Sequence, residues 1–183
     1  NPVGGLEQCN DDINFPSDPT SRVRFDHFVP DAGLFGYLAV SVDGFNNAAG
    51  DVQLNVTTRG DDQHNAVLLT GVPATGTLSN TYASVEAGEQ HGACTYGGDG
   101  AAHTVWFQWT SPTSRYYTAL ADGFDTEVTV FADDGSGHPG DIVGCGEDQV
   151  ASLSAQARFP GVAGTRYWIQ VDGYSTNTGT ITM

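Results

Sequence analysis

The stretch Val105-Trp106-Phe107-Gln108-Trp109 combines aromatic, β-branched and alternating polar residues, and it decides the fold expected for this chain. Alternation with a period of two is typical of a β-strand that has one buried face. The same pattern recurs in four other stretches: residues 37–42, 52–56, 127–131 and 167–171. No stretch keeps a helical 3.6-residue apolar stripe over three turns, so the sequence predicts strands throughout.

Clusters of Asp, Asn and Gly separate these expected strands. They are Asp43-Gly44, Asn46-Asn47, Asp122-Gly123, residues 133–137 and Asp172-Gly173. Such residues favour tight turns because they hydrogen-bond their own backbone or adopt positive φ. Short strands joined by turns predict an all-β chain, and we expect an antiparallel β-sandwich of jelly-roll type.

The charge balance limits the partners. The 183 residues contain 6 basic and 22 acidic side chains, which gives a formal net charge of −16. This excess argues against nucleic acid and against an anionic membrane surface. No apolar run reaches the roughly 18 residues of a spanning helix, and the first twelve residues lack a signal-peptide layout. The sequence is therefore interpreted as a mature or excised segment of a longer, secreted or surface-exposed polypeptide.

The three cysteines are Cys9, Cys94 and Cys145. None lies in a C-x-x-C pair or near a histidine at zinc-ligand spacing. One disulfide with one unpaired thiol is the favoured arrangement, ahead of buried free thiols and of a zinc site.

An internal repeat organises the chain. Cys9-Asn10-Asp11-Asp12, Val23-Arg24-Phe25, Val42-Asp43-Gly44-Phe45 and Gly50 recur in the same order as Cys145-Gly146-Glu147-Asp148, Ala157-Arg158-Phe159, Val171-Asp172-Gly173-Tyr174 and Gly179. The two final glycines follow their Asp-Gly turns at the same spacing. Length differences elsewhere fall in expected loops, where insertions are tolerated. Repeats of this kind indicate stacked or tandem modules.

Only the second copy has its front half, so residues 1–58 are predicted to be the C-terminal half of one repeat and residues 59–183 a complete repeat. If Cys94 pairs with Cys145 inside the complete repeat, the partner of Cys9 belongs to a front half supplied from elsewhere. A half sandwich exposes an apolar face and unpaired strand edges, which favours completion by a neighbouring repeat or subunit.

Several motifs together suggest a family. They are Gly60-Asp61-Asp62 with Asn65-Ala66, Glu86-Ala87-Gly88-Glu89, residues 104–112, Phe124-Asp125-Thr126, Cys145-Gly146-Glu147-Asp148 and residues 164–174, with residues 9–12 and 21–25 matching in the first copy. In these motifs the chain resembles the bacterial pre-peptidase C-terminal domain family, which is related to the collagen-binding modules of clostridial collagenases. The resemblance implies a non-catalytic β-sandwich module of exported proteins, and some members of this family bind calcium.

Calcium needs six to eight oxygen ligands from several segments. The candidate ligands share a position in or beside an acidic turn: Asp61, Asp62, Asp122, Asp125, Glu147 and Asp148. The alternative is that these carboxylates only cap turns and keep the surface soluble. The high negative charge favours a bound cation, which would relieve repulsion locally.

Other residues have structural or binding roles in this interpretation. Asp43 and Asp172 are expected to start equivalent tight turns. Trp106 and Trp109, three residues apart, should lie on opposite strand faces, with at least one in the core and the other available to a glycan. Arg24 and Arg158 are expected to pair with carboxylates after the cysteines.

The catalytic inventory is thin. His27, His64, His91, His103 and His138 are scattered, and no H-E-x-x-H or G-x-S-x-G motif occurs. We therefore expect no enzyme. The favoured function is an extracellular structural or adhesive repeat of a surface protein or filament, stabilised by calcium and completed by strand complementation. The alternative is a collagen- or polysaccharide-binding module attached to an exported hydrolase, and a third, an accessory folding or secretion module, stays open.

Overall fold

The computed structural model describes residues 21, 41–44, 48–54, 57–90, 102–149 and 152–183. The chain divides into two units, Asn1–Leu54 and Asn55–Met183. This division lies close to the predicted repeat boundary after residue 58. That the first unit is half of a repeat stays a prediction, because most of it lies outside the described residues.

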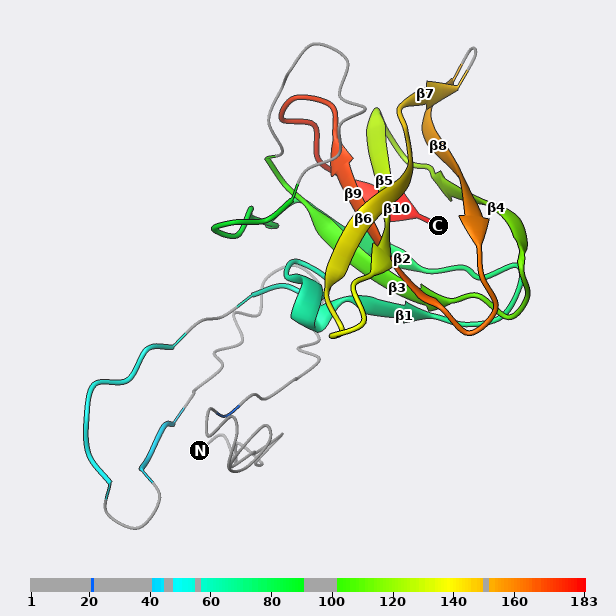
Figure 1. The fold of residues 1–183 in the computed structure, drawn as a ribbon. Helices are drawn as coiled ribbons and strands as arrows, with labels where there is room; N and C mark the ends of the chain where they lie inside the picture. The colour runs from blue at the N-terminus through cyan, green and yellow to red at the C-terminus, as the bar shows by residue number, and fades with distance from the viewer. Residues whose placement is uncertain (1–20, 22–40, 45–47, 55–56, 91–101, 150–151) are drawn as a thin grey trace, which may run out of the picture. The chain divides into compact units, whose positions relative to one another are not determined.

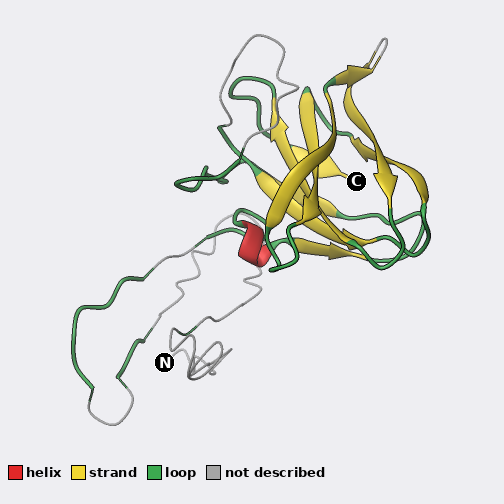
Figure 2. Cartoon of the chain, in the orientation of Figure 1, coloured by secondary structure: helices red, strands yellow, loops and turns green. Residues whose placement is uncertain are grey.

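In its described residues the second unit contains strands and one short 3-10 helix, joined by loops (Figures 1 and 2). Its elements are η2 (Gln63–Asn65), β1 (Val67–Leu69), β2 (Thr77–Ser79), β3 (Val105–Thr110), β4 (Arg115–Ala121), β5 (Thr126–Asp133), β6 (Pro139–Gly146), β7 (Asp148–Gln149), β8 (Ser152–Gly161), β9 (Arg166–Gly173) and β10 (Thr180–Thr182). The expected strands around residues 105–109, 127–131 and 167–171 are confirmed as β3, β5 and β9. The strands expected over residues 37–42 and 52–56 are not found in their described parts, residues 41–42 and 52–54.

The strands form two layers. One sheet has the order β1-β3-β9-β5-β6, and all its pairs are antiparallel except β1 with β3. Opposite it lie β4-β8-β7 and β10-β2, which a single antiparallel bridge from Asp122 to Thr182 connects. The all-β sandwich predicted from the sequence is confirmed.

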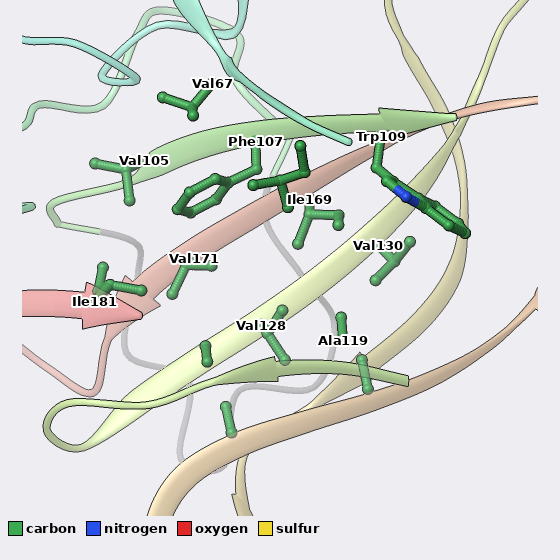
Figure 3. Close-up of a cluster of buried hydrophobic side chains, with 14 of the residues drawn as sticks. Val67, Val105, Phe107, Trp109, Ala119, Val128, Val130, Ile169, Val171 and Ile181 are labelled. Atoms are coloured by element: carbon green, nitrogen blue, oxygen red, sulfur yellow. The ribbon is translucent and has the colours of Figure 1, made fainter. Parts of the chain in front are cut away.

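The core lies between the layers, as the strand alternation requires. Val105, Phe107 and Trp109 on β3 point inward beside Ile169 and Val171 on β9 (Figure 3). The opposite layer contributes the small residues of β4 and β8 together with Phe159 and Ile181. Small residues facing large ones let the two sheets approach closely at native packing density.

Both tryptophans of β3 are buried, so the expectation that one would be exposed is wrong. Trp109 belongs to the core and is 5% exposed, whereas Trp106 is 1% exposed on the outer face of the same strand. There Trp106 joins Ala66, Phe131 and Trp168 in a second apolar cluster. The sequence alternation placed the two rings on opposite faces but gave no sign that the outer face is also covered.

β6 lies against β8. At two of the contacting positions β6 has glycine, so no side chain separates the two backbones. A Cβ on Gly144 would lie 2.8 Å from the carbonyl oxygen of Arg158. A Cβ on Gly146 would collide with the carbonyl oxygen of Gln156. These glycines therefore permit the close approach of two backbones, which is a positional role that glycine alone fills.

The Gly146→Ala substitution should destabilise the second unit by about 2 kcal/mol or more, because neither backbone can move without disturbing its sheet. Urea unfolding measures the change. Gly50→Ala is the matched control, since a Cβ there meets nothing within 4 Å. Equal stability of the two variants would contradict the close packing of β6 on β8.

Candidate functional site

Two of the predicted calcium ligands, Asp61 and Asp62, act on the backbone instead. Asp61 is 3% exposed and accepts the Ser84 N–H at 2.6 Å. Asp62 is the N-cap of η2, where it accepts the His64 N–H at 2.6 Å and contacts the imidazole Nδ1 at 2.7 Å. Adjacent in sequence, the two carboxylates thus serve different segments.

Asp122 has a similar structural role at the junction between β4 and β10. Its carboxylate accepts the Gly123 N–H at 2.9 Å and the Ser154 hydroxyl at 2.6 Å. The backbone of the same residue bonds to Thr182 in both directions. Asp122 therefore connects three strands of one layer.

The remaining predicted ligands are brought together. Asp125, Glu147, Asp148 and Tyr174 line one open pocket of about 370 Å³. Burial raises the pKa of Asp125, and repulsion from the Asp148 carboxylate raises it further. The pocket therefore brings together carboxylates from two separate chain segments.

These residues do not fit a calcium site as they stand. Within the described ranges, no group of three or more His, Cys, Asp or Glu side chains is arranged to hold a metal ion. Three of the six predicted ligands are engaged with backbone or hydroxyl donors elsewhere. Calcium binding therefore stays a prediction, and no structural role in the described residues depends on it.

Because Asp61, Asp62 and Asp122 accept hydrogen bonds from the protein itself, removal of divalent cations should leave the thermal unfolding midpoint of the chain unchanged to within about 2 °C. Differential scanning calorimetry with and without EDTA, followed by added calcium, measures this. A large decrease that calcium reverses would show that the carboxylates form a metal site after all.

A carboxylate network, which the sequence analysis did not identify, covers the outer aromatic cluster. Glu89 accepts the indole N–H of Trp106 at 2.9 Å and the Gln170 amide at 2.8 Å through the same oxygen. Its other oxygen accepts the Glu86 N–H at 2.9 Å. The motif Glu86-Ala87-Gly88-Glu89 contains both carboxylates of this network. The sequence alone does not show that Glu89 bonds to Trp106 and Gln170, which lie on two distant strands.

Glu86, a half-buried member of this network, has a raised pKa. Burial, then the hydrogen bond and repulsion from Glu89, raise the pKa of Glu86 to about 7. The folded state keeps this proton at a higher pH than the unfolded chain does. The stability that Glu86 contributes is therefore present at low pH and is lost as the pH rises through about 7.

Glu86→Gln should therefore stabilise the chain relative to wild type at pH 8, and the difference should vanish toward pH 4. The gain should stay below about 1 kcal/mol, because solvent screens a half-buried group. Urea midpoints across this pH range measure it. Asp141→Asn, which removes an exposed carboxylate on β6, is the control; the same pH-dependent gain there would contradict the specific role of Glu86.

The Asp-Gly turns of the two predicted copies have the same local geometry. Gly44 donates its N–H to Asp43 at 2.8 Å, and Gly173 donates to Asp172 at 2.7 Å. A Cβ on either glycine would collide with the carbonyl group four residues later, that of Ala48 or of Asn177. Asp172 also accepts the N–H groups of residues 102 and 103, consistent with the structural role expected of this aspartate.

Among the described residues, Arg158 has no ion pair with a carboxylate, contrary to expectation. Its guanidinium lies over the ring of Tyr116, 4.5 Å from the centroid. The ion pairs of the described residues include Arg166 with Asp133 and His64 with Asp62, but none with Arg158. Arg24, its counterpart in the first copy, lies outside the described residues.

Cys145 is disulfide-bonded. Both other cysteines, Cys9 and Cys94, lie outside the described residues, so the pairing of Cys94 with Cys145 stays a prediction. Of the five histidines, His27 and His91 also lie outside the described residues.

Comparisons with protein-family models, with curated proteins and with solved structures gave no match. The resemblance to the pre-peptidase C-terminal domain family therefore rests on the motifs alone. Among the described residues, no helix has the length and apolar character needed to cross a membrane.

Proposed function

We propose that this chain is a non-catalytic, structural and adhesive repeat module of an extracellular surface protein or filament, similar to pre-peptidase C-terminal domains. In this proposal the first unit is a half repeat that a neighbouring repeat or subunit completes. The observation that carries the proposal is the exposure of apolar residues in the first unit whose counterparts in the second unit are buried.

The repeat alignment makes this comparison direct. Val42 corresponds to Val171, and Val52, two residues after Gly50, corresponds to Ile181, two residues after Gly179. Val42 and Val52 are 54% and 66% exposed, whereas Val171 and Ile181 are 0% exposed. Leu54 adds a third exposed apolar side chain. Equivalent residues thus lack the cover that the complete repeat provides.

The cover itself is known from the second unit. Ile181 pairs with Leu78 on β2, and Val171 pairs with Val105 on β3 and Val128 on β5. All three partners belong to the front half of the repeat. A front half of the same kind would give the first unit the same cover, and its strands would extend the same sheets. Such a contact is heterologous, which suits tandem arrays and filaments.

An extracellular location is part of the proposal. A disulfide at Cys145 supports an oxidising compartment. The large negative charge suits an exposed, soluble surface. Stabilisation by calcium, which the sequence analysis expects, stays a prediction of this proposal; in the described ranges no group of three or more His, Cys, Asp or Glu side chains could hold an ion.

The alternative, a module that binds collagen or polysaccharide, is favoured by one specific observation. Tyr116, on the outward face of β4, is 63% exposed and carries Arg158 on its ring. An exposed aromatic on a sheet face is what a binding module requires and what a purely structural repeat does not. The adhesive part of the proposed function includes this face.

Val52→Ser and Ile181→Ser test the proposal as a matched pair. Ile181→Ser should destabilise the second unit by about 3 kcal/mol or more, because it opens a cavity and buries a hydroxyl. Val52→Ser should leave unfolding unchanged and should reduce both 1-anilinonaphthalene-8-sulfonate fluorescence and self-association in sedimentation velocity. Equal destabilisation by both substitutions would show that the first unit is already covered and would overturn the half-repeat proposal.

A further inference from the structure

The outward face of the β4–β8 pair has a regular surface. Along β4 the exposed residues Tyr116, Thr118 and Leu120 alternate with the buried Ala119 and Ala121. Directly opposite them on β8 lie Pro160, Arg158 and Gln156, which are also exposed. Along β4 the polar Thr118 lies between Tyr116 and Leu120, and it faces Arg158 across the strand pair. We call these six residues the β4–β8 face.

The central contact of the β4–β8 face is preorganised. The Arg158 guanidinium lies 4.5 Å from the centre of the Tyr116 ring, and this stacking holds both planar groups over the sheet. Tyr116 remains 63% exposed and Leu120 44% exposed. In the described part of the chain the ion pairs do not include Arg158.

We propose that the β4–β8 face is a binding surface for a neutral polysaccharide. A pyranose ring has apolar faces and a rim of hydroxyl groups, which matches an exposed aromatic ring flanked by an arginine, an amide and a hydroxyl. Tyr116 supplies the stacking surface. Arg158 and Gln156 donate to ring hydroxyls, and Thr118 both donates and accepts. This inference deepens the adhesive part of the proposed function and rests on it.

The charge of the chain selects the class of polysaccharide. A net charge of −16 repels polyanionic chains, such as polyuronates, and a single arginine does not compensate for it. A neutral chain meets no such repulsion. The face is also formed by regular strands of one layer, so a flat, extended polymer can lie across it without a change in the backbone.

Affinity electrophoresis of the intact chain in native gels tests the inference. The gels contain hydroxyethylcellulose, xylan, galactomannan or polygalacturonate, and pull-downs use insoluble cellulose and chitin. We expect retardation or capture by at least one neutral polymer and none by polygalacturonate. Tyr116→Ala and Arg158→Gln should each weaken binding about tenfold, because each substitution removes one stacked or hydrogen-bonded contact with the polymer.

Two matched variants control for general surface effects. Tyr82→Ala removes another exposed tyrosine, 84% exposed and outside the face, and Arg59→Gln removes an exposed arginine. Both should bind as wild type does. Circular dichroism and urea midpoints confirm that Tyr116→Ala and Arg158→Gln remain folded.

The outcomes separate this inference from the half-repeat proposal. Binding by no neutral polymer, equal loss in the control variants, or binding of polygalacturonate alone would each overturn the neutral-polysaccharide surface. Loss of self-association in Tyr116→Ala would instead assign the face to a protein partner and would equally overturn it. None of these results changes the expected behaviour of Val52→Ser, which tests completion of the first unit.

Discussion

The burial of apolar strand faces between two sheets is the constraint on which the rest of this structure depends. β3, β9 and β5 can bury one face only if a second layer lies opposite. In the second unit β4, β8, β2 and β10 belong to this layer, and alanines of β4 and β8 form part of the core. In the first unit Val42 and Val52 are exposed, and under the half-repeat proposal the same requirement would act there.

Several carboxylates in the described part of this acidic chain organise its own backbone. Asp61 anchors the segment at Ser84, Asp62 begins η2, and Asp172 holds residues 102 and 103 beside its turn. These carboxylates accept hydrogen bonds from backbone N–H groups in loops and in η2, which would otherwise need water as their acceptor. Asp125, Glu147 and Asp148 instead line one open pocket together with Tyr174.

The sequence predicted the layers better than the sites. Period-two alternation identified β3, β5 and β9, and the repeated Asp-Gly motifs identified turns that have the same hydrogen bond in both copies. These are local features, and local sequence encodes them. The stacking of Arg158 on Tyr116 depends on the register of β4 against β8. The network around Glu89 depends on strands far away in sequence, and alternation does not reveal such pairings.

Hydrogen–deuterium exchange of the dilute chain, read by mass spectrometry, tests the central claim most directly. It compares the segment after Gly50 with the equivalent segment after Gly179 in the same molecule. If the first unit is an uncovered half repeat, residues 51–54 should exchange at nearly the unfolded rate, whereas residues 180–183 should be protected together with the core strands. Equal protection of the two segments would contradict the account, because it would mean that the first unit already has its cover.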